Sequence, residues 1–213
     1  MSFELSSHPS DKMSSWVGGF WIGDPNGDMV LEFEGYQWKV KEDIIAAHFK
    51  WLDAAFPDRL PGSHIVFSGL SGGTSPQVFS ALLEFLHTNQ FGGQLWEPFP
   101  SFFTYVEAYF AADCLGVKTL KDMMVERIEA LSWQIVALRG AHSPLPAAEE
   151  RKHLESFVIA VVSVERRKWS AKIQKAMYDA GERLKYRLIE LSSFRQFVEG
   201  FDAGKDFSRA IGL

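Results

Sequence analysis

The sequence contains a single cysteine, Cys114, among its 213 residues, so no disulfide can form within the chain. A chain without disulfides is typical of the reducing compartments of the cell. No apolar run approaches the roughly 20 residues that a membrane-spanning helix requires. Residues 1–15 are polar and serine-rich, so we expect no regular structure there, and they lack the features of a signal peptide. We therefore expect a cytoplasmic or nuclear protein that no membrane segment anchors.

Motifs for metal and cofactor binding are also missing. The six histidines do not have the spacing of metal ligands on one helix, and no cysteine cluster accompanies them. Neither G-x-G-x-x-G nor a P-loop, the common glycine-rich signatures of nucleotide binding, occurs in the chain. These absences predict a protein without metal ligands or a cofactor.

Positive charge is scarce in the first two thirds of the chain. Residues 1–148 carry 9 Lys and Arg against 17 Asp and Glu, whereas residues 149–213 carry 13 against 10. The net charge of −5 argues against nucleic acid as the main partner. The basic C-terminal part leaves one alternative open, which is a nucleic-acid-associated or transcription-related factor.

Aromatic residues, in contrast, are abundant, with 18 Phe and 7 Trp. Aromatic side chains contribute to protein cores and to interfaces between proteins. Residues 15–22, SWVGGFWI, have the pattern of a strand, and an exposed edge strand this apolar would be an aggregation hazard unless it paired with another chain. We therefore identify Trp16, Phe20 and Trp21 as candidate interaction residues and predict a self-associating protein, a homodimer in its simplest form.

A β-hairpin followed by two helices is the clearest pattern in the chain. Apolar and polar residues alternate over 30–34 and again over 36–40, with Gly35 where the chain must reverse. Glu42 and Asp43 then place two acidic side chains in the first turn of a helix, where the helix dipole favours them.

After a short strand at 64–68, HIVFS, the apolar spacing predicts only helices. Pro76 begins the first of them behind a Thr74 or Ser75 cap, and a capping box at 193–196 opens a short last helix. The helical stripes between these points lie at residues 79–86, 103–110, 120–128, 154–162 and 169–188. Strands followed by helices predict an α+β fold.

The hairpin and its helices resemble the opening of a BTB/POZ domain, whose loose pattern is an Asp, a strand, a Gly, a strand and a helix pair. Two later segments resemble the family in the same order, LLEFLHTNQF at 82–91 and ADCLGVKTL at 112–120. The wide aromatic loop at 92–100 is similar to that of fungal members. The resemblance implies a small β-sheet with a helical cluster, a helical C-terminal extension, and a protein that binds other proteins rather than an enzyme.

The resemblance also implies partners, because the family supplies scaffolds and adaptors that often self-associate. Asp28 matches an Asp that helps to form the charged pocket of the dimer in metazoan members, so it joins the candidate interaction residues. Members that recruit cullin scaffolds often carry an apolar-x-Glu signal before the third helix, and the corresponding GLSGGTSPQ has no Glu. A cullin partner is therefore not expected, and the sequence names no other protein.

These observations predict an organisation in four parts. They are an N-terminal segment with an edge strand at 1–27, a BTB/POZ-like domain at 28–139, a linker at 140–148 and a helical extension at 149–213. In the extension, we expect the apolar stripe over 154–162 to dock on the domain. The basic residues Arg166, Arg167 and Lys168 are then left for a partner, or simply form the solvated side of an amphipathic helix.

A rival motif is GLSGG at 69–73, which fits G-x-S-x-G, the nucleophile elbow of serine hydrolases, with Ser71 as the nucleophile. Asp113 with His142 or His153 would have to complete the triad. An α/β-hydrolase needs several βαβ units after the elbow, whereas this sequence is almost entirely helical there. We therefore expect Ser71 to have no catalytic role, and a serine hydrolase is the second alternative.

Overall fold

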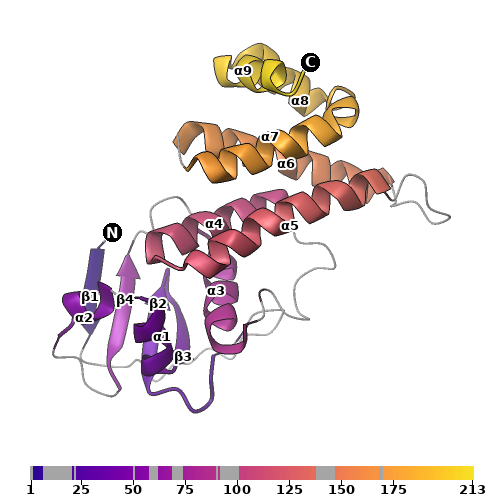
Figure 1. The fold of residues 1–213 in the computed structure, drawn as a ribbon. Helices are drawn as coiled ribbons and strands as arrows, with labels where there is room; N and C mark the ends of the chain where they lie inside the picture. The colour runs from indigo at the N-terminus through magenta and orange to yellow at the C-terminus, as the bar shows by residue number, and fades with distance from the viewer. Residues whose placement is uncertain are drawn as a thin grey trace. The chain divides into compact units, whose positions relative to one another are not determined.

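The computed structural model describes residues 2–6, 21, 23–49, 51–57, 62–68, 74–89, 91, 101–137, 147–167 and 170–213. Within these ranges the chain is α+β, as the sequence predicts, with every strand before residue 69 and helices after it (Figure 1). No helix in this part of the chain combines the length and the apolarity that crossing a membrane requires.

Two compact units divide the chain. The first consists of residues 1–99 and 107–121, and the second of residues 100–106 and 122–213. Two helices, α4 (Phe102–Leu115) and α5 (Lys118–Ala137), contribute residues to both units. The predicted linker at 140–148 lies almost wholly outside the described residues, so this domain boundary stays a prediction.

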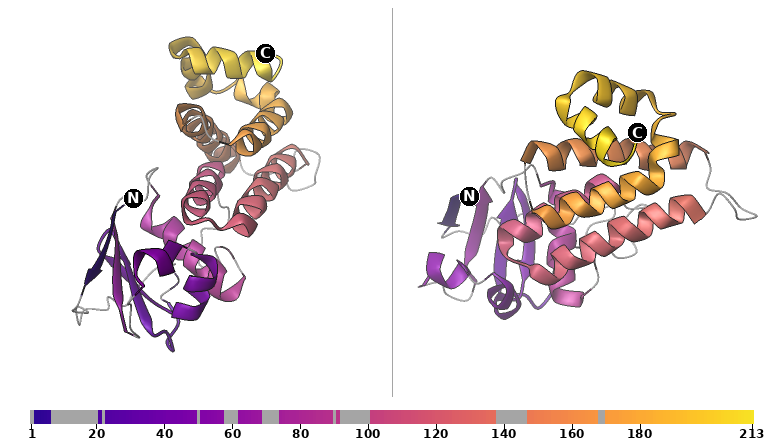
Figure 2. Two further views of the ribbon diagram at one scale, coloured as in Figure 1. Left: turned by 60° about the vertical axis from the view of Figure 1, so that its left-hand side comes forward. Right: turned by 45° about the horizontal axis from the view of Figure 1, so that its top comes forward.

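The first unit contains a four-stranded sheet with the strand order β1-β4-β2-β3, visible from two further sides in Figure 2. Its strands are β1 (Ser2–Ser6), β2 (Met29–Phe33), β3 (Tyr36–Val40) and β4 (His64–Ser68). β2 pairs antiparallel with β3 and parallel with β4. Glu34 and Gly35 form the hairpin turn with φ values of 50° and 80°, and a two-residue turn of this kind requires positive φ.

β1 corrects the expectation that residues 1–15 have no regular structure. It pairs antiparallel with β4 along its whole length, from Ser2 opposite Ser68 to Ser6 opposite His64. The serine-rich composition hid a period-two pattern in the sequence, because SFELS alternates polar and apolar residues. The aromatic segment at 15–22, which we expected to be the strand, lies outside the described residues except for Trp21 and belongs to no described strand.

Besides its parts of α4 and α5, this unit contains the helices α1 (Glu42–His48), α2 (Trp51–Ala55) and α3 (Pro76–Thr88), and α3 packs on the sheet through aromatic rings. Phe79 of α3 lies 5.2–5.3 Å, between ring centroids, from Phe33, Trp38 and Phe67 of the sheet. All four side chains are buried. Such aromatic pairs contribute roughly 0.5–1.5 kcal/mol each beyond the burial of their area, so they anchor α3 on the sheet.

The second unit is helical. Beyond its parts of α4 and α5, its helices are α6 (Ala147–Arg167), α7 (Ala171–Leu188), α8 (Ser192–Gly200) and α9 (Asp202–Ala210). The predicted capping box at 193–196 is wrong, because α8 begins at Ser192 behind Leu191, without a side-chain cap, and α9 follows it as a second short helix. The buried Leu191 fixes the start of α8 by packing, which places Ser193 inside the helix.

The apolar stripe predicted over 154–162 is largely buried. Leu154, Phe157, Val158 and Val161 are at most 6% exposed, whereas Val162 is half-buried. The Phe157 ring lies 5.0 Å from Phe102 of α4 and 6.1 Å from Phe207 of α9, between ring centroids. These contacts all fall within the second unit, so the expected docking of the stripe on a BTB/POZ-like domain stays a prediction.

Candidate interaction surfaces

Asp28, the interaction residue that the family resemblance suggested, has a structural task. It stands immediately before β2, and its Oδ1 accepts a hydrogen bond of 2.8 Å from the backbone N–H of Glu42, the first residue of α1. Lys41, in the N-cap position of that helix, supplies no side-chain cap. Asp28 therefore caps α1 from a distant part of the chain and ties the helix to the start of the sheet.

Next to this cap, His87 connects the end of α3 to the start of α1. Its Nε2 accepts from the backbone N–H of Lys41 at 3.1 Å, and its Nδ1 lies 2.9 Å from the carbonyl oxygen of Leu83. Because an imidazole that accepts at Nε2 and donates at Nδ1 is neutral, this geometry favours the uncharged ring. Burial lowers the pKa of His87, which agrees with the neutral form. The Trp21 ring lies 4.8 Å away and covers the imidazole.

Lys41 also holds Asp24, which opens the turn before β2. The Lys41 Nζ and the Asp24 Oδ2 are 3.6 Å apart. The pKa of the Asp24 carboxyl is lowered, first by the hydrogen bond from the Asn26 backbone amide and also by Lys41. We call Trp21, Asp24, Asp28, Lys41 and His87 the hairpin–helix cluster. It brings together two of the sequence-predicted residues, Trp21 and Asp28, and uses both to hold the β2–β3 hairpin against α1 and α3.

The other sequence-predicted residues do not join this cluster in the part of the chain that the structure describes. The described part of the chain does not include Trp16, Phe20 or Lys168. It includes the backbone of Arg166 and Arg167 at the end of α6, but not their side chains. The glycine loop that contains Ser71, and His142 with it, are likewise outside. Asp113 is engaged by Lys121 at 2.5 Å. His153 is buried in α6, and burial lowers its pKa.

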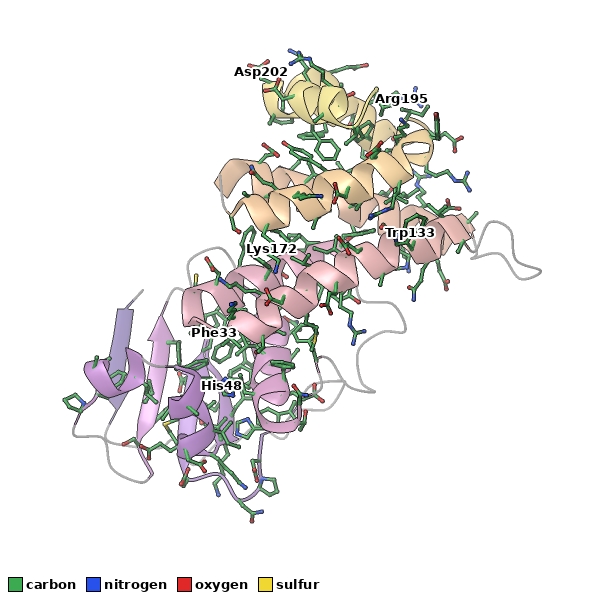
Figure 3. All side chains as sticks on the ribbon, viewed as in Figure 1. Phe33, His48, Trp133, Lys172, Arg195 and Asp202 are labelled. Atoms are coloured by element: carbon green, nitrogen blue, oxygen red, sulfur yellow. The ribbon has the colours of Figure 1, made fainter. Side chains whose placement is uncertain are left out.

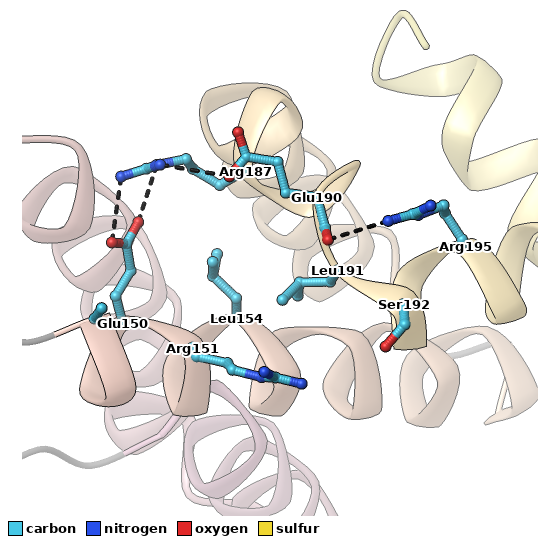
Figure 4. A pocket seen from close by; sticks show the side chains of 9 residues that line it. Glu150, Arg151, Leu154, Arg187, Glu190, Leu191, Ser192 and Arg195 are labelled. Atoms are coloured by element: carbon cyan, nitrogen blue, oxygen red, sulfur yellow. Dashed lines mark hydrogen bonds and ion pairs between the residues drawn. The ribbon is translucent and has the colours of Figure 1, made fainter.

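The second unit has an open pocket of about 400 Å³ where α6 and α8 begin and α7 ends (Figure 4). Its lining residues are Ala147, Glu150, Arg151, Leu154, Arg187, Glu190, Leu191, Ser192 and Arg195. Arg187 binds Glu150 through two nitrogens, with Nε–Oε1 at 2.9 Å and Nη2–Oε2 at 3.2 Å. It also lies 3.6 Å from Glu190. A bidentate pair of this kind is a strong contact, so the pocket's central charges clamp α6 to α7.

A second surface lies where side chains of α5 and α7 meet. The two helices run parallel, because Lys172 Nζ contacts Asp122 at 2.6 Å and, further along both helices, Arg183 Nη1 donates to Ser132 Oγ at 3.2 Å (Figure 3). The Arg183 guanidinium also lies over the Trp133 ring, 4.8 Å from its centroid.

Three large side chains on the same stretch of α5 and α7 remain in solvent. Trp133 is 56% exposed, Val136 is 41% exposed and Tyr186 is 67% exposed. We call Trp133, Val136, Arg183 and Tyr186 the aromatic–arginine face. The sequence analysis missed it. A usable signal was present, because Trp133 and Tyr186 are aromatic residues at positions where the helical periodicity of α5 and α7 calls for polar ones.

Among the described residues, no group of three or more His, Cys, Asp and Glu side chains has the arrangement of a metal site. No protein-family model matches the chain, and a search of curated proteins finds no match to it.

Proposed function

We propose that this protein is a BTB/POZ-like interaction module that self-associates and acts as a scaffold or adaptor. The observation that carries the proposal is the order of elements in the first unit. A hairpin with a glycine turn, β2–β3, leads into the helix pair α1 and α2, and β4 then returns parallel to β2. Parallel pairing requires a crossover connection, and the helix pair provides it.

The positions of the family-like segments agree with this order. Asp28 stands at the head of the first hairpin strand, and the segment that resembles the family's helix end closes α3 at Thr88. The segment at 112–120 spans the end of α4 and the start of α5, with Gly116 at φ 77° between them. The first two segments lie at the strand and the helix end that the resemblance suggests, whereas the third, which resembles a single helix of the family, is divided by Gly116 between α4 and α5. The order of the segments supports the proposal.

The use of polar groups in the first unit also supports binding over catalysis. Asp28 caps a helix, His87 bridges two elements through both ring nitrogens, and Lys41 holds Asp24. Catalytic groups must keep a reactive atom available to a substrate, whereas these groups fix the backbone. A rigid platform of this kind is what a binding scaffold requires.

Light scattering of the full chain at micromolar concentration tests the proposal. We expect about twice the chain mass of 24.1 kDa. The variant Trp16→Asp with Phe20→Asp should shift the mass to that of a monomer, while the matched variant Ser7→Asp with Ser14→Asp should not. A monomeric parent chain, or a dimer that survives the aromatic substitutions unchanged, would contradict self-association through the N-terminal aromatic segment.

A further inference from the structure

Within the part of the chain that the structure describes, three cations on α7 have carboxylate partners and Arg183 has none. Lys172 is paired with Asp122, Lys175 with Asp179, and Arg187 with Glu150 and Glu190. Among the residues that the structure describes, no carboxylate lies within ion-pair distance of Arg183. Its described contacts are the Ser132 hydroxyl and the face of the Trp133 ring.

These two contacts hold the guanidinium in place without neutralising it. A guanidinium stacked on an indole has lost most of its rotamer freedom before any ligand arrives, so less entropy is lost on binding. The hydroxyl occupies Nη1, and an arginine has five N–H donors in a planar fork that fits a carboxylate. Arg183 is therefore oriented to receive a carboxylate that this part of the chain does not supply.

The apolar members of the face lie beside this arginine. Since α5 and α7 run parallel with Ser132 next to Arg183, Val136 and Tyr186 fall about one turn further along their helices, on the same side. Trp133, Val136 and Tyr186 then border Arg183 with exposed apolar surface. Trp, Tyr and Arg are the residues most enriched at the energetic centres of protein interfaces.

We infer that the aromatic–arginine face binds an extended or helical segment of a partner protein that sets an Asp or Glu carboxylate on Arg183 and a large apolar side chain against Trp133 and Tyr186. We choose an acidic and apolar partner segment on the ground of charge complementarity, because the face combines an oriented cation that has no carboxylate partner with exposed apolar area. Lys185, 5.4 Å from the Tyr186 ring centroid, adds a second positive charge at its edge. The inference goes beyond the proposed function, since it concerns the second unit and requires no BTB/POZ-like architecture.

A random peptide library displayed on phage and selected on the full-length chain provides the probe. We expect enriched peptides to carry Asp or Glu within a few residues of Trp, Phe, Leu or Met. Synthetic, fluorescein-labelled copies are then titrated by fluorescence polarisation. Arg183→Gln and Trp133→Ala should each weaken binding by about tenfold or more. The affinity of Arg183→Lys should lie between those of the parent chain and of Arg183→Gln, because an ammonium keeps the charge but loses the planar fork and the stacking on Trp133.

Matched controls separate this face from general charge effects. Arg209→Gln removes an exposed arginine of the same unit that pairs with Asp206, and it should leave the affinity within about twofold. Peptides whose acid is changed to its amide should also bind about tenfold more weakly. Melting temperatures establish that each variant folds, and Tyr186→Ala, at the most exposed position, replaces Arg183→Gln if that variant does not fold.

Three outcomes would overturn the inference. Selection could enrich no peptide or only acid-free ones, or the enriched peptides could bind folded Arg183→Gln as tightly as the parent chain. A change from dimer to monomer mass in Arg183→Gln would show that a second copy of this chain occupies the face instead. A monomeric parent chain, by contrast, would contradict the proposed function and leave the peptide test intact.

Discussion

Among the described residues, the aromatic rings that pack on the sheet of the first unit are buried, whereas the second unit leaves Trp133, Tyr186 and Phe201 in solvent. Phe33, Trp38 and Phe79 are buried around the sheet of the first unit, while Trp133 and Tyr186 of the second are more than half exposed. The charges differ as well, with 7 Lys and Arg against 14 Asp and Glu in the first unit and 15 against 13 in the second.

The comparison teaches that net charge does not locate a binding surface. The second unit is nearly neutral because it holds almost equal numbers of cations and carboxylates, and several of its described cations, such as Lys172, Lys175 and Arg209, pair with carboxylates of the same unit. Exposed pairs of this kind contribute little to stability or recognition, about 0–1 kcal/mol each. What distinguishes the aromatic–arginine face is that Arg183, which has no carboxylate partner among the described residues, is held in place by Ser132 and Trp133 with exposed apolar area beside it.

The largest expected effect tests the enclosed part of the second unit. Phe157 is fully buried between Phe102 and Phe207. Phe157→Asp removes a core aromatic, which costs about 3–5 kcal/mol in comparable Phe→Ala changes, and it also buries an unpaired carboxylate. We expect the second unit to unfold, measured by circular dichroism during thermal melting.

Ile159→Asp is the matched control for that variant. It lies on the same helix two residues away, and its side chain is 52% exposed. Its melting temperature should stay close to that of the parent chain. If Phe157→Asp melted like Ile159→Asp, the apolar stripe of α6 would face solvent or a partner, and the contrast between enclosed and exposed aromatics in this unit would be wrong.

A smaller effect is expected where α8 and α9 meet. A Cβ at Gly204 would lie 2.2 Å from the carbonyl oxygen of Phe197, whereas a Cβ at Gly200 would meet no atom within 4 Å. Gly204→Ala should therefore lower the free energy of unfolding by about 1–3 kcal/mol in urea titrations. Gly200→Ala should leave it nearly unchanged. Equal effects at both positions would show that the two helices do not pack this closely.

The cap on α1 provides a test in the first unit. Asp28→Ala should lower the free energy of unfolding by about 1 kcal/mol, because the N–H of Glu42 loses its acceptor. Asp28→Asn should restore most of that loss, since Asn caps helices as well as Asp does. Light scattering on Asp28→Asn then separates the role of Asp28 as a helix cap from its expected role in a dimer contact. A stable Asp28→Asn chain that becomes monomeric would place the carboxylate charge itself in a dimer contact.

The elements that local patterns determine were predictable from the sequence. Period-two alternation located β2 and β3, Gly35 located their turn, and Ser75 with Pro76 located the start of α3, where the Ser75 hydroxyl accepts from the Val78 N–H. Non-local determinants were not predictable. β1 forms because β4 offers it an edge, and α8 begins where Leu191 is buried rather than where a serine could cap it.

The candidate site shows the same division. The sequence identified Trp21 and Asp28 but could not show that both are used within the fold, since their contacts to His87 and Glu42 span more than ten residues of chain. The aromatic–arginine face depends on the parallel register of α5 and α7, which brings Ser132 beside Arg183 across 51 positions. No local pattern encodes that register, because it results from packing in the folded unit.

The smallest effect is a pH dependence that both units share. Burial is the largest cause of the lowered pKa of His87 in the first unit and of His153 in the second. Above the ordinary histidine pKa of 6.5, each ring is neutral whether the chain is folded or not, so its contribution to stability is fully present. As the pH falls below 6.5, the unfolded chain binds the proton first. Stability is then lost until the pH has passed the lowered pKa of the folded state.

Urea unfolding of the parent chain at pH 7.5 and at successively lower pH should show this loss. His87→Gln should reduce it, because a glutamine amide can accept from the Lys41 N–H and donate to the Leu83 carbonyl without binding a proton. His153→Gln removes the other group and serves as the comparison between units. If His87→Gln kept the parent's full pH dependence, the imidazole would not be held in its neutral form at the junction of α3 and α1, and the hairpin–helix cluster would need a different assignment of its hydrogen bonds.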